Sequence, residues 1–216
     1  MNPANYDARY ETERGRWIGN TEYRLLNHLL VAKPNENLPD VGCGTGWFTR
    51  QFSAQATLDV TGLDLNAEWI TYARSRDAKA HYLTADTRAL PFATDSFDRT
   101  VSMTALCFIN DWPIALREIV RVTRSRFVVG FLNKRSLLWC DKGQSDGTNA
   151  YYGAHWHTEP ELRAALIGLP VCHIHFHTVI FLPSGSRVAR AVECVLPNHL
   201  PWGGCLVISG DIKPSF

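Results

Sequence analysis

The sequence predicts an α/β fold: a doubly wound, mostly parallel seven-stranded sheet with helices on both faces. Short apolar, strand-like runs alternate with segments of helical periodicity along most of the chain, which is the pattern of a parallel sheet. The first expected strand leads into three glycines at alternate positions, Gly42, Gly44 and Gly46. In doubly wound sheets this first strand-to-helix turn is where ligands bind.

Composition narrows the class of protein. The chain has 216 residues, 45% of them hydrophobic and 20% charged, which suits one globular domain with a sizeable core. The formal net charge of +1 argues against a dedicated nucleic-acid partner. No apolar run approaches the roughly 18 residues of a membrane span, and the N-terminus shows no signal peptide. Six scattered cysteines without a C-x-x-C pair are typical of a reduced, cytoplasmic protein.

The elements of the N-terminal half follow from periodicity and turn residues. Leucines at helical spacing predict a helix over 20–31, capped by Asn20 or Thr21. A short strand then meets the glycines, although Pro39 removes a ladder N–H from it. We therefore expect a bulge or an unpaired position at Pro39. The elements expected next are a helix over 45–55, a strand over 58–65, a helix over 66–75 and a strand over 81–85.

The C-terminal half continues the alternation. A strand is expected over 97–103, a helix over 114–122 and a strongly apolar strand over 126–132. The sequence Thr-Glu-Pro-Glu at 158–161 is a capping box that begins another helix. Two late strands, over 171–182 and 205–212, would close one edge of the sheet. We expect a single domain over 1–216, with 1–31 as an N-terminal cap and 133–157 as a lid insertion.

Acidic residues follow the first expected strands. Asp40 precedes the glycines, and Asp64 ends the next strand at about the 20-residue spacing at which an acid grips a ribose diol. Asp86 follows the third strand. A dinucleotide-binding G-x-G-x-x-G turn would need glycine at position 47, where this chain has Trp47. The pattern thus disfavours a nicotinamide or flavin oxidoreductase and indicates another nucleotide-like cofactor.

These residues resemble a known family. Residues 40–46 (DVGCGTG) are similar to motif I of the class I S-adenosylmethionine-dependent methyltransferases. Segments 62–66 (GLDLN), 84–98 (TADTRALPFATDSFD) and 115–124 (ALREIVRVTR) resemble the later signatures, in the same order. The resemblance is to the small-molecule branch with the ubiquinone and menaquinone methyltransferases (type 11). It implies a Rossmann-like methyltransferase fold, S-adenosylmethionine as cofactor, and methyl transfer to a small, partly apolar acceptor by in-line displacement.

On the methionine side of the cofactor, the resemblance assigns five residues. Gly42, Cys43 and Gly44 would lie under the methionine part, and Asp40 would help to hold its amino group. Met103 would face the same part through its backbone. Asp40 could instead be an ordinary acid at the end of a strand.

On the nucleoside side, the resemblance assigns five more residues. Asp64 would take the ribose hydroxyls, and Leu65 would pack on the adenine. Asp86 and Thr87 would meet the adenine edge, and Tyr6 would cover the cofactor. The alternatives are that Asp64 is an ordinary strand-end acid, that Asp86 only caps a helix, and that Tyr6 is a packing aromatic.

Two histidines, His155 and His157, are candidates for a general base, which is needed only if the nucleophile carries a proton. The alternative is that they only shape the loop before the capped helix. Three further histidines, at 173, 175 and 177, alternate along one expected strand. The outer two would stand roughly 13 Å apart, too far for one zinc ion with bonds of about 2 Å. The sequence therefore predicts no metal site.

The substrate class follows mainly from what is missing. Residues 106–109 (LCFI) stand where many relatives carry histidines, so a catalytically silent S-adenosylmethionine-binding protein is the alternative to an enzyme. The tetrapeptide typical of adenine-directed methyltransferases is missing after the fourth strand. We expect a small-molecule acceptor, no nucleic acid, no membrane span, and a monomer or homodimer. The identity of the acceptor and of the accepting atom stays open.

Overall fold

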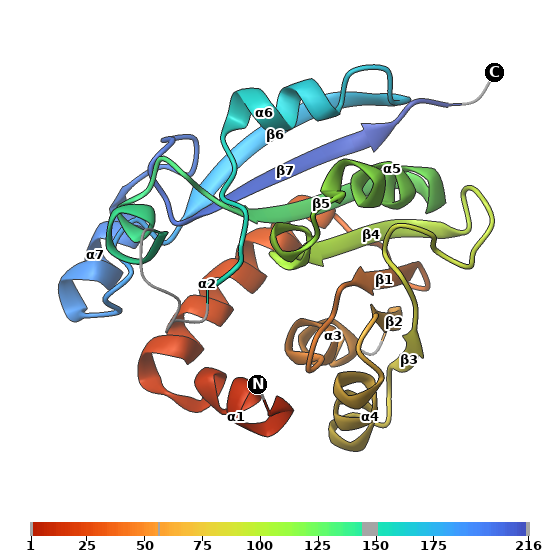
Figure 1. Cartoon of the computed structure of the whole chain (residues 1–216), viewed down its shortest axis with the longest axis horizontal. Helices are drawn as coiled ribbons and strands as arrows, with labels where there is room; N and C mark the ends of the chain where they lie inside the picture. The colour runs from red at the N-terminus through yellow and green to blue at the C-terminus, as the bar shows by residue number, and fades with distance from the viewer. Residues whose placement is uncertain (1, 56, 144–150, 215–216) are drawn as a thin grey trace.

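One seven-stranded sheet organises the computed structural model, which describes residues 2–55, 57–143 and 151–214 (Figure 1). The strand order is β3-β2-β1-β4-β5-β7-β6. The first five strands pair in parallel, and β7 runs antiparallel to both β5 and β6. The strands are β1 (Asn37–Val41), β2 (Asp59–Asp64), β3 (His81–Thr84), β4 (Phe97–Met103), β5 (Thr123–Leu132), β6 (Val171–Val179) and β7 (Cys205–Ile212). The predicted mostly parallel, doubly wound sheet is confirmed.

The helices fill the connections between the strands. They are α1 (Pro3–Asp7), α2 (Glu13–Leu30), α3 (Trp47–Ser53), α4 (Ala67–Arg76), α5 (Trp112–Val122), α6 (Glu159–Ala165) and α7 (Arg187–Val195). Three short helical turns accompany them: η1 (Ala8–Glu11), η2 (Ala105–Phe108) and the π-helical η3 (Trp139–Gly143). Among the described residues, no helix is long and apolar enough to cross a membrane.

Helices cover both faces of the sheet, because alternate residues of each central strand point to opposite sides. In β5, Phe127 and Phe131 belong to the core under α5 and α6, whereas Val128 belongs to the core under α2 and α3. The second core receives Leu26 and Leu30 from α2, both fully buried. The C-terminal half of the expected cap over 1–31 is therefore part of the central core.

Several element boundaries differ from the predicted ones. The first long helix begins at Glu13, capped by the Thr12 hydroxyl that accepts from the Gly15 N–H at 3.0 Å, so the predicted caps at Asn20 and Thr21 are wrong. The helix α7 was not predicted. The capping box at 158–161 is confirmed at the start of α6. In β6, a register shift at 172–175 places His173 at φ 49°, which interrupts the expected alternation of histidines.

Pro39 lies within β1 without distorting it. The strand keeps continuous register with β2 over five residue pairs, with Pro39 opposite Thr61, so the predicted bulge is wrong. On the other side, β1 pairs with β4 only at Asp40 and Val101, so Pro39 is unpaired toward β4, in agreement with the second alternative of that prediction. The Ser102 hydroxyl adds a 2.6 Å hydrogen bond to the Val41 carbonyl. A proline is tolerated in this central strand because the ladder to β4 is short and a side chain supplements it.

Candidate functional site

The glycine turn after β1 has a backbone that only glycine adopts easily. Gly42, Gly44 and Gly46 have φ of 76°, 57° and 78°. The N–H groups of Gly42 and Cys43 both donate to the Leu63 carbonyl, at 2.7 and 2.8 Å. A Cβ at Gly42 would lie 2.2 Å from the Ala105 Cβ, so the turn packs directly on η2, which follows β4. The turn therefore joins the ends of β1, β2 and β4.

Asp64, at the end of β2, fixes this turn in place. One carboxylate oxygen accepts from the Gly44 N–H at 2.8 Å, and the other accepts from the Asn66 N–H at 2.9 Å. Asn66 in turn caps α4. The Asp64 carbonyl accepts from the Ala85 N–H at 3.0 Å, which brings the end of β3 to the same place. The half-buried Asp64 carboxylate is thus held at the edge where three strands end.

Asp40 is buried beside the turn. It is 2% exposed, and one of its carboxylate oxygens accepts from the Thr49 hydroxyl at 2.7 Å. Burial raises the pKa of Asp40 to about 7, and the nearby Asp64 charge adds to this, although the Thr49 hydrogen bond opposes it. Burial also raises the pKa of the Cys43 thiol. Asp40 therefore titrates near neutral pH, while Cys43 stays a neutral packing residue.

The residues expected around an adenine lie at the ends of β2 and β3. Leu65 is 63% exposed, so its side chain can cover a ring. Thr87 is buried. Asp86 accepts from the Arg88 N–H at 2.9 Å and pairs with the Arg88 guanidinium at 2.8 Å. That pairing lowers the pKa of Asp86. The turn after β3 is not a regular helix, so Asp86 does not cap a helix there. Its side chain instead accepts from the Arg88 N–H and closes a turn.

Met103, the last residue of β4, is buried against β5. A Cβ at Gly130 would lie 2.4 Å from the Met103 sulfur, so the glycine makes room for this side chain. Thr104 follows with φ 56°, and its N–H donates to the Gly130 carbonyl at 2.8 Å. The chain turns sharply here into η2, whose Ala105 packs against Gly42 of the glycine turn.

Tyr6, in α1, packs against α4 near the glycine turn. Its ring is 4.9 Å from the Trp69 ring of α4, and the Arg9 guanidinium lies 5.0 Å above the Tyr6 ring centroid. Figure 1 shows α1 and α4 at the same end of the molecule. Trp47 stacks on Tyr10 at 4.5 Å, so it packs between α3 and the N-terminal segment. The aromatic residues of the N-terminal segment thus lie next to the glycine turn.

Asp7 attaches this N-terminal segment, a role that sequence patterns did not indicate. The buried carboxylate accepts from the Arg50 guanidinium at 2.7 and 2.9 Å and from the Thr45 hydroxyl at 2.9 Å. The Tyr72 hydroxyl adds a bond at 3.3 Å. The sequence signal for Asp7 is the Tyr-Asp pair at 6–7, in which the family resemblance assigns a role to the tyrosine alone. Asp7 ties α1 to both α3 and α4.

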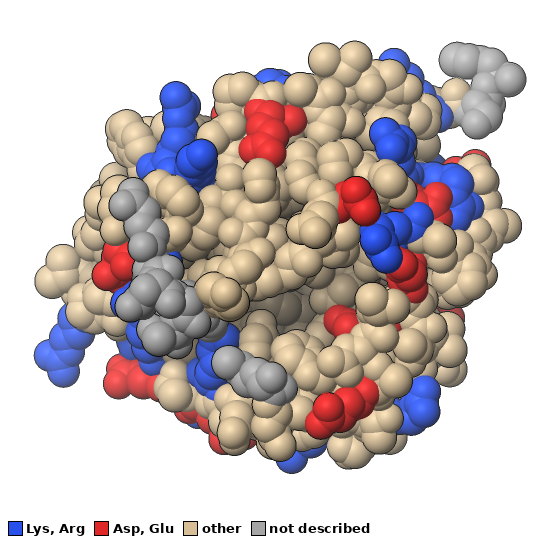
Figure 2. Space-filling view, in the orientation of Figure 1, with Lys and Arg blue, Asp and Glu red and all other residues tan. Residues whose placement is uncertain are grey.

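A cavity of about 210 Å³ lies between the N-terminal helices and the ends of β4, β5 and β7. Figure 2 shows a hollow in the middle of this face, bordered mostly by uncharged residues. Of the predicted cofactor residues, Tyr6 lines this cavity. Apolar walls come from Phe108, Leu138 and Ile180, among others. A wider cavity of about 670 Å³ shares Arg9 and Arg14 with it, so the two adjoin.

Charged groups line the smaller, inner cavity of about 210 Å³. Arg9 and Arg14 contribute guanidinium groups, and Glu22 of α2 contributes a carboxyl group. Burial raises the pKa of Glu22 to about 8, and the Glu193 charge adds to this. Glu22 is therefore mostly protonated at neutral pH and able to donate a hydrogen bond. The inner cavity has positive rather than balanced charge under these conditions.

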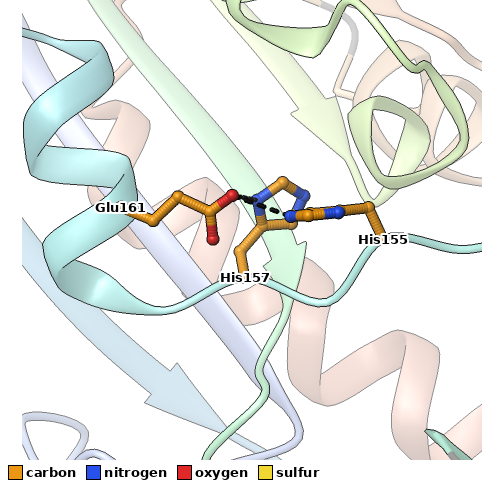
Figure 3. Close-up of side chains that lie close together, drawn as sticks. All are labelled: His155, His157 and Glu161. Carbon is orange, nitrogen blue, oxygen red and sulfur yellow. Dashed lines mark hydrogen bonds and ion pairs between the residues drawn. The ribbon is translucent and has the colours of Figure 1, made fainter.

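His155 and His157 do not line either cavity among the residues that the structure describes there. His155 is exposed, with its Nε2 2.7 Å from a Glu161 carboxylate oxygen (Figure 3). His157 is fully buried, with its ring 4.8 Å from the rings of both Trp112 and Phe131. Burial, followed by the His155 charge, lowers the pKa of His157 to about 4. A general-base role for these histidines stays a prediction.

Substituting Asp7 by alanine should release the N-terminal segment. The nearly buried Arg50 would lose its partner, a change that costs about 3 kcal/mol in buried pairs. We expect the amide hydrogens of α1 to exchange faster by a corresponding factor, measured by hydrogen exchange and mass spectrometry. Glu13→Ala is the control, because its pair with Arg190 is exposed and contributes less than about 1 kcal/mol. Unchanged protection of α1 in Asp7→Ala would contradict this attachment.

The chain resembles known proteins both in sequence and in structure. A model of the methyltransferase domain family matches residues 39–128, from β1 to the middle of β5. A malonyl-[acyl-carrier protein] O-methyltransferase of Erwinia pyrifoliae is 39% identical over 189 residues, covering 83% of this chain and 69% of that protein. The enzyme of the same name from Pectobacterium atrosepticum is 40% identical over 126 residues, covering 58% of this chain and 47% of its own length.

Solved structures agree in fold. An S-adenosylmethionine-dependent methyltransferase of Thermotoga maritima superposes with a TM-score of 0.75 at 20% identity, covering 97% of this chain and 95% of that one. The geranyl diphosphate C-methyltransferase of Streptomyces coelicolor gives a TM-score of 0.68 at 17% identity, covering 91% and 80%. At such low identity, these structures establish the fold alone. Together with the identity and coverage of the Erwinia enzyme, the matches show that this chain belongs to the class I S-adenosylmethionine-dependent methyltransferases.

Proposed function

We propose that this methyltransferase transfers the methyl group of S-adenosylmethionine to the free carboxylate of a short dicarboxylic acyl group that is bound to a carrier as a thioester. The observation that carries the proposal is the inner cavity, which combines apolar walls with Arg9 and Arg14. The names of the Erwinia and Pectobacterium relatives support it, because both act on malonyl-[acyl-carrier protein].

The residues of the glycine turn fit the cofactor. The left-handed turn at Gly42 and Gly44 exposes backbone rather than side chains to a ligand. The Asp64 carboxylate is already fixed by two backbone N–H groups, so it can accept from ribose hydroxyls without first being ordered. The amino group of the cofactor's methionine part, if it binds beside Asp40, would favour the ionised carboxylate by its positive charge. Leu65 and Tyr6 provide apolar cover on either side.

Arg9 and Arg14 suit a carboxylate acceptor. A guanidinium group binds a carboxylate through two parallel hydrogen bonds, which fixes both its position and its orientation. Arg14 is itself held by a 2.6 Å hydrogen bond from its Nε to the Pro183 carbonyl. The protonated Glu22 avoids repulsion of the acceptor and can donate to a carbonyl oxygen. The adjoining wider cavity offers a path for the thioester-linked arm of a carrier.

A carboxylate acceptor also agrees with the positions of the two candidate bases, His155 and His157. When bound, S-adenosylmethionine supplies a methyl group on a sulfonium that is already activated for displacement. A carboxylate carries no proton at neutral pH, so no general base has to remove one. The positions of His155 and His157 outside the cavities are consistent with this. The chain then has to orient the carboxylate and exclude water, which the apolar walls and the N-terminal segment can do.

We also propose that the enzyme works in the reducing cytoplasm. All six cysteines are free thiols, and three of them (Cys43, Cys107 and Cys205) are buried as small packing residues. A chain that relied on an oxidising compartment would be expected to pair some of its cysteines.

Replacing Asp64 by alanine should weaken cofactor binding. The loss of its hydrogen bonds to the ribose should cost roughly 1–3 kcal/mol, the usual penalty for an unsatisfied buried partner. Calorimetric titration with S-adenosylhomocysteine measures this difference. Asp59→Ala is the matched control, since Asp59 begins the same strand and is largely exposed. If the folded Asp64→Ala protein bound the ligand as tightly as the unaltered chain, the ribose assignment would be wrong.

Cofactor binding should tighten as the pH rises through 7. Without ligand, the pKa of Asp40 is raised to about 7, and the ammonium group of the ligand would lower that pKa in the complex. Binding then releases a proton from Asp40, so the affinity falls with decreasing pH by at most about tenfold per pH unit. Titrations with S-adenosylhomocysteine at about pH 6 and about pH 8 measure this. Asp40→Asn should remove the dependence, and equal affinities in the unaltered chain would contradict it.

Turnover tests the acceptor class. Malonyl thioesters, both free and on acyl-carrier protein, should be converted to methyl esters, detected by mass spectrometry, whereas an acetyl thioester should not react. Arg14→Gln should raise the KM for the malonyl thioester by roughly 10-fold or more, because a hydrogen bond to a charged group contributes about 1.5–3 kcal/mol.

Arg16→Gln is the matched control for this experiment, since Arg16 lies on the same helix outside both cavities and is exposed. Binding of S-adenosylhomocysteine without methylation of any malonyl thioester would reject the proposed acceptor. It would also favour the alternative of a catalytically silent cofactor-binding protein if no other acceptor reacted.

A further inference from the structure

We propose that His155, His157 and Glu161 form a zinc site that holds the C-terminal end of the expected lid insertion (133–157) against the end of β5. The sequence predicts no metal site, because its cysteines are scattered and the histidines at 173, 175 and 177 are too far apart along one strand for a single ion. In the fold, the ligand atoms of these three residues all lie within 4.8 Å of one another (Figure 3). The site is separate from both cavities and does not depend on the proposed acceptor.

Two of the three donor separations are close to those that a single ion needs. The His155 Nε2 lies 2.7 Å and the His157 Nδ1 lies 3.7 Å from the same Glu161 carboxylate oxygen. Tetrahedral zinc with bonds of 2.0–2.1 Å holds its ligands about 3.3 Å apart. Both distances to Glu161 are within an ångström of this value, and the two histidine nitrogens, which lie within 4.8 Å of each other, would have to move closer together. Small rotations of the exposed His155 and the half-exposed Glu161 would therefore close the triangle around an ion.

The backbone on both sides of the histidines is fixed, so the site is largely preformed. The His155 N–H donates to the Cys107 carbonyl of η2 at 2.7 Å, and the His157 N–H donates to the Leu132 carbonyl at 2.8 Å. The Lys134 N–H donates to the His157 carbonyl at 2.8 Å. Glu161 is fixed through the capping box, in which its other oxygen accepts from the Thr158 N–H at 3.3 Å. One Glu161 oxygen is thus used for the cap while the other faces the histidines.

His157 provides the independent indication of a ligand. It is 0% exposed, and neither ring nitrogen has a hydrogen-bond partner among the described residues. A buried imidazole without partners is costly, because one nitrogen carries a proton and the other a lone pair. The rings of Trp112 and Phe131 leave its Nδ1 directed toward Glu161. An ion between the three residues would accept the Nδ1 lone pair and satisfy this nitrogen.

The donor set points to zinc. Two imidazoles and one carboxylate form a His₂Glu set, which zinc binds with one remaining position for water. Magnesium and calcium prefer oxygen ligands and are disfavoured by two imidazole nitrogens. The ion would join the segment at 155–157 to the first turn of α6, next to the end of β5. Its role is therefore to fix this loop rather than to act on the methyl acceptor.

Zinc titration of the full chain, after treatment with a chelator, tests the site. Isothermal calorimetry should show one zinc ion per chain. Substitution with cobalt should give the visible absorption of a tetrahedral ion. Glu161→Gln should weaken zinc binding at least tenfold and remove the increase in melting temperature that zinc gives to the unaltered chain. Glutamine keeps the capping box, so this variant is expected to fold. His155→Ala, at an exposed position, should have the same effect.

His173→Ala is the matched control, because His173 is also exposed and also lies near a carboxylate, 3.1 Å from Asp211. It should bind zinc as the unaltered chain does. The affinity for S-adenosylhomocysteine should be equal in all variants, which verifies that they are folded. The proposal is overturned if the unaltered chain binds no zinc stoichiometrically. It is equally overturned if Glu161→Gln and His155→Ala retain the full zinc affinity.

Discussion

The carboxylate of Asp64, bonded to the N–H groups of Gly44 and Asn66, is the interaction on which the rest of the site depends. It links the glycine turn after β1 to the start of α4, at the edge where β1, β2 and β3 end. The turn itself can exist only because its glycines adopt left-handed conformations, and a Cβ at Gly42 would strike η2. A charged group that is fixed in this way by backbone donors is already arranged for a ligand.

A second buried charge, the carboxylate of Asp7, attaches the N-terminal segment next to this edge. Asp7 and Arg50 pair across α1 and α3, and Thr45 of the glycine turn donates to the same carboxylate. The segment is therefore joined to the turn that it covers. As a result, Tyr6 and Arg9 line the inner cavity, and Tyr6 also packs on Trp69 of α4. Binding at one of these places should influence order at the other.

The charge of the inner cavity supports our proposal of an acceptor that is anionic before it binds. Two guanidinium groups and a Glu22 carboxyl that stays protonated near neutral pH leave positive charge among apolar walls. An anionic carboxylate is both attracted by this charge and reactive without a base. The histidines, which could have served as bases for a protonated nucleophile, are not among the described residues that line the cavities, although the His157 N–H donates to the Leu132 carbonyl at the end of β5. They form a separate cluster with Glu161.

Local chemistry in the sequence determined the alternating elements, the glycine turn, the acids at Asp40 and Asp64 and the capping box of α6. Each of these depends on neighbours within a few residues: apolar periodicity, left-handed glycines or a side chain that reaches its own helix. The tertiary structure alone decided the roles of Asp7, Glu22 and His157, because residues far away in the chain pair with or bury them: Arg50 for Asp7, Glu193 for Glu22, and Trp112 and Phe131 for His157. Pairing, burial and a raised or lowered pKa arise only when distant segments remove water from a charge. Local sequence patterns therefore cannot predict these effects.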